Sequence, residues 1–60
     1  MKVGDLVSFQ QSKTIWGLVL ELGNRYWNGI SWSVSHARVE WPDCNATWEI
    51  TDRLEILKTT

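Results

Sequence analysis

Five short apolar runs fill most of the chain, and their periodicity predicts strands. In the third run, Ala37, Val39 and Trp41 alternate with polar residues, which is the pattern of a strand with one buried face. None of the runs is long enough to bury a face alone, but five together can curl into one small barrel. We therefore expect an all-β, five-stranded antiparallel barrel. The strands are predicted at residues 4–9, 16–22, 37–41, 47–50 and 54–57.

The connections between the runs carry recognisable turn signals. Residues 42–46 are rich in turn formers and predict a hairpin between the third and fourth strands. Residues 51–53 leave room for one helical turn, which Thr51 can cap. Gly17 permits a bend in the second strand, which then contributes to the core from both sides. The predicted core contains Val7, Val19, Val39, Trp41, Trp48, Ile50, Leu54 and Ile56.

Residues 24–35 show no clear periodicity and predict a long loop between the second and third strands. Irregular loops of this length are usually functional or disordered, and the aromatic residues of this one argue against disorder. Asn28 and Gly29 are typical of a two-residue type I′ turn. They predict that residues 25–27 and 30–32 pair as a protruding, two-stranded tongue.

Sixty residues allow a single domain, residues 1–60, with one modest core. A domain of this size buries only about 60% of the surface that its unfolded chain exposes, so it usually needs extra support. The single cysteine excludes an internal disulfide, and the single histidine gives no recognisable zinc site. Five tryptophans can supply heavy aromatic packing, and they also suggest a binding partner.

The charged residues nearly balance, with six Lys and Arg against seven Asp and Glu. This balance lacks the basic footprint of a nucleic-acid-binding protein, so nucleic acid is an unlikely partner by charge. No apolar stretch reaches membrane-spanning length, and the first residues contain no signal-peptide hydrophobic region. We expect a protein that stays in a reducing cytoplasm, unless it leaves inside a particle, and that contacts no membrane.

The order of the predicted elements resembles that of SH3-like barrels. The opening residues Gly4, Asp5, Leu6 and Val7 are similar to the start of many such barrels. More narrowly, the chain outside residues 24–35 resembles small SH3-like proteins encoded by tailed bacteriophages, including those of cyanobacteria. This resemblance implies a barrel fold, a phage setting, and a location in the host cytoplasm or the virion. It implies no ligand, because the fold hosts many unrelated functions.

The aromatic side chains of residues 24–35 are the best candidates for a binding surface. Trp and Tyr dominate the hot spots of protein interfaces, and a protein partner is therefore expected. The alternative is that these side chains fold back as a lid on a small core, and the sequence leaves both possibilities open. Trp16 could belong to the core or to this surface. The candidate partner-binding residues are Arg25, Tyr26, Trp27, Ile30 and Trp32.

The remaining polar residues suggest no catalytic chemistry. His36 is expected to be a surface or capping residue, and Cys44 an inert thiol without a nearby base. Arg25 beside aromatic residues permits single-stranded nucleic-acid binding as the alternative function. We predict a non-enzymatic protein-binding or particle-building module with no cofactor and no metal. Its partner would be another protein or copies of itself in a larger assembly.

Overall fold

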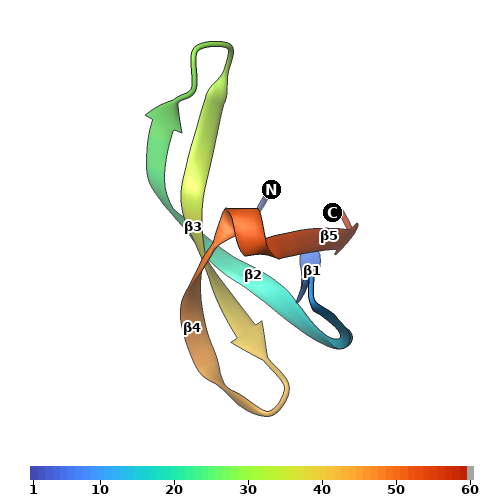
Figure 1. Cartoon of the computed structure of the whole chain (residues 1–60). Helices are drawn as coiled ribbons and strands as arrows, with labels where there is room; N and C mark the ends of the chain where they lie inside the picture. The colour runs from blue at the N-terminus through green and yellow to red at the C-terminus, as the bar shows by residue number, and fades with distance from the viewer. Residues whose placement is uncertain (60) are drawn as a thin grey trace.

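The structure is a computed structural model that describes residues 1–59. It contains one antiparallel sheet of five strands. The strands follow the order β4-β3-β2-β1-β5 in the sheet (Figure 1). All five predicted strands are present, which confirms the all-β, antiparallel prediction. The elements are β1 (Leu6–Phe9), β2 (Ser12–Trp27), β3 (Trp32–Trp41), β4 (Cys44–Ile50), η1 (Thr51–Arg53) and β5 (Leu54–Lys58).

The sheet is not closed into a barrel. β4 and β5 are its two edges, and they are connected through η1 without pairing to each other in the part of the chain described. A salt bridge between Lys13 Nζ and Glu55 Oε2, 3.0 Å long, joins the start of β2 to β5. The sheet therefore rolls around a core but keeps two open edges.

The single helical turn expected at residues 51–53 is present as η1. Thr51 does not cap it, however, because the N-cap residue is Ile50 and no side chain caps the turn. The Thr51 hydroxyl instead donates to the carbonyl oxygen of Val34, 2.8 Å away, and lies 3.3 Å from that of Ser35. Thr51 thus ties η1 to β3. Within residues 1–59, no helix is long and apolar enough to cross a membrane.

The core is small and lies inside the rolled sheet. Phe9 packs on Trp41 with ring centroids 4.8 Å apart, and Trp41 Nε1 donates to Thr47 Oγ1 at 2.9 Å. Phe9, Met1 and Leu22 are partly buried against the core. Five of the eight predicted core residues are therefore buried, and Ala37 joins them. The buried cluster consists of Val7, Val19, Ala37, Val39, Trp41 and Leu54.

Trp48 and Ile50 lie outside the core, so their predicted burial was wrong. The buried residue Val39 pairs with Thr47, which places Thr47 on the inner face and the next residue, Trp48, on the outer face. The cause is a register shift between Val39 and Trp41, where β4 contains one extra residue. A shift of one residue moves every following side chain to the opposite face.

Ile56 was also predicted inside the core and is instead exposed. It pairs with the buried residue Val7, so both residues occupy the same face of the sheet. β5 is an edge strand, however, and no further strand covers Ile56. The open sheet thus explains this difference.

Residues 24–35 form a strand hairpin rather than an irregular loop, and we call this segment the tongue. β2 and β3 continue through it and project beyond the rest of the sheet (Figure 1). The predicted two-stranded form is confirmed, but the register differs. Trp27 pairs with Trp32 instead of Ile30, and the residues between the strands are Asn28–Ser31.

Candidate protein-interaction surface

Trp27 and Trp32 form a cross-strand pair near the end of the tongue. Their rings meet edge to face, with centroids 5.7 Å apart and planes inclined by 69°. Such a pair stabilises a hairpin by about 0.5–1.5 kcal/mol beyond the area it buries. The side chains nevertheless remain 55% and 58% exposed, respectively. The pair thus stiffens the tongue and still exposes apolar surface to solvent.

Arg25 supplies the only formal charge on the tongue, because residues 24–35 contain no other Lys or Arg and no Asp or Glu. Its guanidinium carbon lies 5.0 Å from the centroid of the Trp32 ring, within the range of a cation–π interaction. The salt bridges found among residues 1–59 do not include Arg25. The tongue therefore carries one positive charge that no acidic side chain neutralises.

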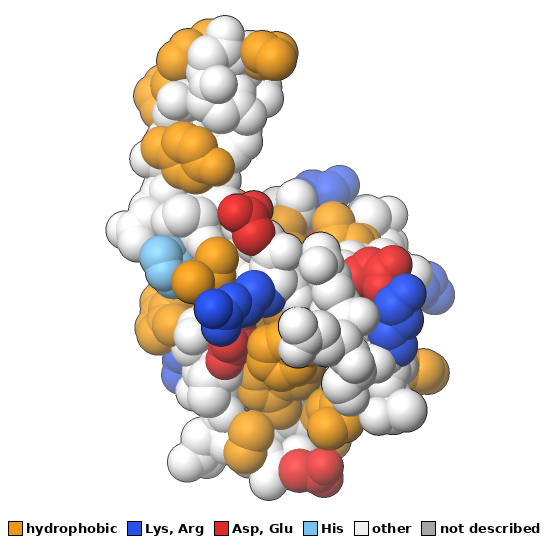
Figure 2. All heavy atoms as spheres, viewed as in Figure 1, with side chains coloured by type: hydrophobic (Ala, Val, Ile, Leu, Met, Phe, Trp, Pro, Cys, Tyr) orange, Lys and Arg blue, Asp and Glu red, His pale blue; other side chains and the backbone are white. Residues whose placement is uncertain are grey.

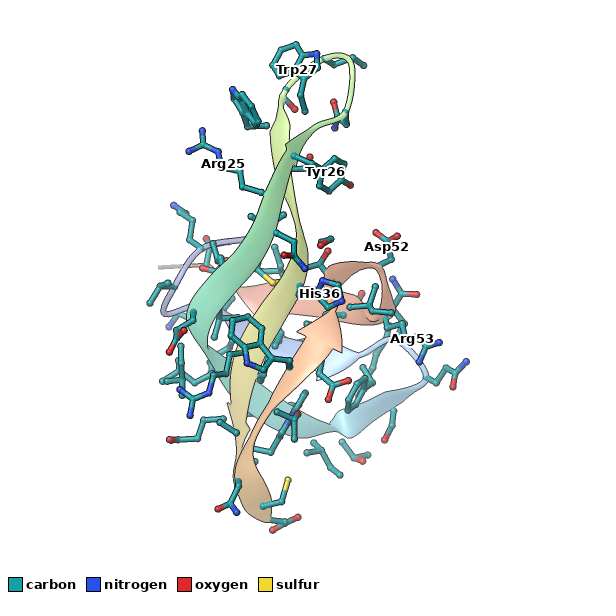
Figure 3. The ribbon with its side chains drawn as sticks, turned by 90° about the vertical axis from the view of Figure 1, so that its left-hand side faces the viewer. Arg25, Tyr26, Trp27, His36, Asp52 and Arg53 are labelled. Carbon is teal, nitrogen blue, oxygen red and sulfur yellow. The ribbon has the colours of Figure 1, made fainter. Side chains whose placement is uncertain are left out.

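The two faces of the tongue both carry large side chains. Arg25 and Tyr26 point to opposite sides of the hairpin (Figure 3). Tyr26 is 45% exposed, and Ile30, in the turn at the tip, is 87% exposed. In the space-filling view, the visible side of the tongue is apolar or uncharged, whereas the charged side chains lie over the body (Figure 2). All five candidate residues are thus brought together on one projecting segment.

The tongue residues do not cover the core as a lid. None of the five belongs to the buried cluster, and the hairpin extends away from the body (Figure 1). Trp32 borders a shallow hollow at the base of the tongue, where Leu54 and Ile56 also lie. The five side chains are therefore not packed into the core, and their role as an interface stays a prediction.

Asn28 fixes the turn at the tip. Its Oδ1 accepts hydrogen bonds from the backbone N–H groups of Ile30 and Ser31, both 2.9 Å long. Its Nδ2 donates to Ser33 Oγ at 3.0 Å. Gly29 has a φ of 98°, a conformation that a glycine adopts without steric penalty. An Asn side chain that bonds the backbone two residues on is a common way to hold such a turn.

Replacing Asn28 with Ala should loosen the tip without unfolding the domain. The backbone amides of Ile30 and Ser31 should lose protection in hydrogen exchange, because their acceptor is gone. The melting temperature should change little, since the tongue lies outside the core. Asn45→Ala is a matched control, because the Asn45 side chain is exposed and makes no hydrogen bond within residues 1–59. A large fall in the melting temperature of Asn28→Ala would show that the tongue supports the body.

Three other residues singled out in the sequence lie away from the tongue tip. Trp16 is exposed near the start of β2, where its Nε1 donates to the carbonyl oxygen of Lys13 at 3.2 Å, so it is not a core residue. Cys44 is an exposed free thiol. His36, expected to be a surface or capping residue, is half-buried at the base of the tongue and lies within hydrogen-bond distance of Asn24 and Ser35 (Figure 3).

One cluster was not anticipated from the sequence, because Trp48 was expected in the core. Trp48 packs instead over Gly23 on the outer face, beside His36 and Asn24. One sequence feature could have indicated this cluster. Gly23 lies inside a strand, and a glycine there often marks the close approach of another group.

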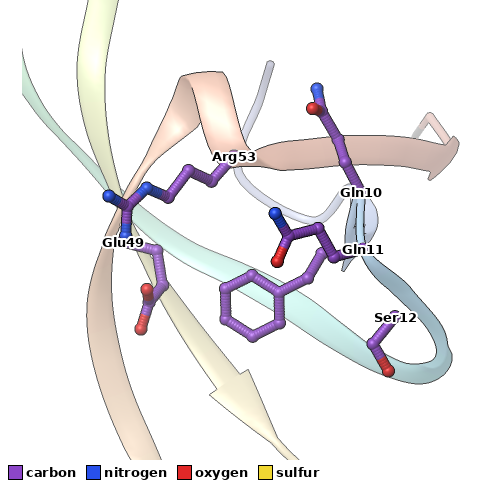
Figure 4. Close-up of a pocket in the computed structure, with 6 residues that line it drawn as sticks. Gln10, Gln11, Ser12, Glu49 and Arg53 are labelled. Carbon is purple, nitrogen blue, oxygen red and sulfur yellow. The ribbon is translucent and has the colours of Figure 1, made fainter.

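A further hollow lies between the β1–β2 turn and the β4–η1 segment (Figure 4). Glu49, on one of its walls, accepts a hydrogen bond from Thr47 Oγ1 at 2.6 Å. Across the described part of the chain, no three His, Cys, Asp or Glu side chains are grouped so that they could hold a metal ion. The hollow is lined by Phe9, Gln10, Gln11, Ser12, Glu49 and Arg53.

Comparisons of the chain with protein-family models, with curated proteins and with solved structures give no match. The exposed aromatic tongue is therefore the feature from which a function is inferred.

Proposed function

We propose that this chain is a non-enzymatic protein-binding module that attaches to a larger assembly through the tongue. The observation that carries the proposal is the exposure of Tyr26, Trp27, Ile30 and Trp32 on a hairpin that projects from the body. Trp, Tyr and Arg are the residue types that dominate interface hot spots. The hairpin presents all three types together.

We further propose that the fold is of the SH3-like type and that the protein is a small structural or accessory component of a tailed bacteriophage. Five antiparallel strands with one helical turn before the last strand support the fold. The resemblance of the sequence to phage-encoded SH3-like proteins supports the setting. The protein would then act in the virion or in the cytoplasm of the infected cell.

The size of the tongue indicates a contact of modest strength. At about 150–250 Å² per aromatic side chain, the exposed fractions of Tyr26, Trp27 and Trp32 amount to about 300 Å². Burying this area contributes about 7 kcal/mol before the cost of association, which is of similar size. A single tongue would thus bind weakly, and several copies in one assembly would bind much more tightly through avidity.

The double substitution Trp27→Ser/Trp32→Ser should abolish capture of the partner. The melting temperature should fall only slightly, because both side chains lie outside the core. Co-purification from infected cells, read by mass spectrometry, measures the capture, and thermal unfolding measures the stability. Trp16→Ser is the matched control, since it removes an exposed tryptophan distant from the tongue in β2. A variant that loses stability and capture in the same proportion would contradict the proposal.

The salt dependence of capture separates this function from nucleic-acid binding. A contact that rests on apolar surface should change little with salt, whereas a contact with phosphates weakens steeply. Recovery that falls steeply between about 50 and 200 mM salt, and that is lost after nuclease treatment, would favour the nucleic-acid alternative over the protein partner.

A further inference from the structure

A second exposed aromatic surface lies on the outer face of the sheet, apart from the tongue tip. A hollow with a volume of about 240 Å³ is lined by Gly23, Asn24, His36 and Trp48. The Trp48 ring is seated over Gly23, where an added Cβ would lie 3.0 Å from Trp48 Cζ3. Because Gly23 has no Cβ, it leaves the space in which the indole ring packs. About half of Trp48 remains exposed to a ligand.

The polar groups of this hollow are held in one arrangement. His36 Nδ1 lies 3.0 Å from Asn24 Nδ2 and 2.8 Å from Ser35 Oγ. These contacts hold the imidazole ring beside Asn24 and Ser35 and leave its Nε2 without a hydrogen bond within residues 1–59. Asn24 Oδ1, an acceptor, likewise makes no hydrogen bond in this part of the chain. The residues that line the hollow thus offer two polar atoms that are free to bind a ligand, His36 Nε2 and Asn24 Oδ1.

The backbone of Asn24 contributes to this arrangement. Its φ is 56°, the left-handed region that few residues other than glycine adopt, although Asn does so more readily than most. Such strained positions cluster at functional sites, where the surrounding structure holds them. Here the conformation occurs at the residue whose amide holds the His36 ring.

The charges near the hollow favour a neutral ligand. Arg38 pairs in register with Trp48, and its Nη1 is bound to Glu21 Oε1 at 3.2 Å. The positive charge of Arg38 is therefore balanced by Glu21, and Arg38 attracts a phosphate or carboxylate ligand only weakly. The volume of the hollow, about 240 Å³, lies just below the usual range for small-molecule sites, about 300–1,000 Å³, so the hollow suits a single small ring.

We propose that this hollow binds a neutral saccharide ring. The apolar C–H face of the sugar would stack on Trp48, and its hydroxyl groups would bond His36 Nε2 and Asn24 Oδ1. Hydroxyl groups suit this pair, because each can both donate and accept. The small contact corresponds to a dissociation constant on the order of 1 mM. This site is independent of the partner contact made by the tongue.

The test is a titration of the ¹⁵N-labelled chain with glucose, galactose and N-acetylglucosamine, followed by NMR. Each sugar is taken to about 50 mM, roughly fifty times the expected dissociation constant. At least one sugar should cause saturable shifts of the Trp48 indole N–H and of the Gly23 and His36 amides. Trp48→Ala should abolish these shifts. Asn24→Gly, which keeps the left-handed backbone accessible and removes the amide, should weaken binding about tenfold by loss of a pre-organised hydrogen bond.

Trp16→Ala is the matched control and should keep the shifts, because it removes an exposed tryptophan near the start of β2. Free uracil tests the competing chemistry of base stacking. The proposal is overturned if none of the sugars produces saturable shifts at Trp48, or if uracil does so and the sugars do not. It is also overturned if the sugars shift Trp16 and Trp27 as strongly as Trp48. None of these outcomes affects the proposed function of the tongue, whose readout is capture of a protein.

Discussion

Replacing Trp41 with Ala should lower the free energy of unfolding by about 3–5 kcal/mol. Trp41 is 5% exposed, stacks on Phe9 and donates a hydrogen bond to Thr47, so its removal leaves a cavity and takes away that hydrogen bond. Small domains have only about 5–15 kcal/mol of stability, and a loss of this size would unfold a large part of the population. Denaturant unfolding, monitored by far-UV circular dichroism, measures the change.

Trp48→Ala is the matched comparison, because the same side chain is removed from a site that is 51% exposed. Its cost should stay below about 2 kcal/mol, since much less apolar area leaves water when Trp48 packs. If Trp48→Ala lowered the free energy of unfolding as much as Trp41→Ala does, Trp48 could not lie on the exposed outer face of β4.

Replacing Gly17 with Ala should have the second-largest effect, about 3 kcal/mol or more, because the core has no room for the added methyl group. A Cβ at Gly17 would overlap Val39 Cγ1 and would lie 2.7 Å from Trp41 Cε3. Both neighbours are buried and cannot move aside without disturbing the packing. Thermal and denaturant unfolding measure the effect.

Gly29→Ala is the control for this prediction. Nothing lies within 4 Å of an added Cβ at Gly29, although its φ of 98° makes a side chain unfavourable there. The expected cost is about 1–2 kcal/mol, confined to the tip of the tongue. If Gly17→Ala left the unfolding midpoint unchanged, the packing described around Trp41 would be incorrect.

The sequence was most informative where one strand showed clean alternation. Ala37, Val39 and Trp41 were predicted to share the buried face of one strand, and all three are buried. Alternation tells which residues share a face, but not which face points inward. In β4 the apolar residues Trp48 and Ile50 share the outer face, because one extra residue inverts the strand. No local pattern marks that insertion.

Closure of the sheet also depends on information that is not local, whereas the turn of the tongue depends on a local side-chain contact that the turn signal alone does not specify. A barrel requires β4 and β5 to pair, and the pattern within each strand says nothing about such a contact. The Asn28–Gly29 signal correctly indicated a hairpin, but the Asn28 side chain bonds the backbone of Ile30 and Ser31 and thereby shifts the turn.

The candidate binding residues were chosen from the sequence because they are aromatic or apolar and lie in a segment without clear periodicity, and their role in binding stays a prediction. The cluster around Trp48 could not be found in this way. It depends on the face that Trp48 occupies and on the position of Gly23 across the sheet. The wrong face predicted for β4 therefore had two consequences. It placed Trp48 in the core, and it left the hollow beside Trp48 unpredicted.

The claim that the tongue carries the partner contact can be tested in one measurement, because the five tryptophans occupy distinct environments. The chain is labelled with 5-fluorotryptophan, and ¹⁹F NMR spectra are recorded with and without the partner recovered by co-purification. We expect the resonances of Trp27 and Trp32 to shift or broaden, while that of the buried Trp41 stays unchanged. Unchanged resonances of Trp27 and Trp32, together with a shift at Trp16 or Trp48, would contradict the assignment of the tongue as the interaction surface.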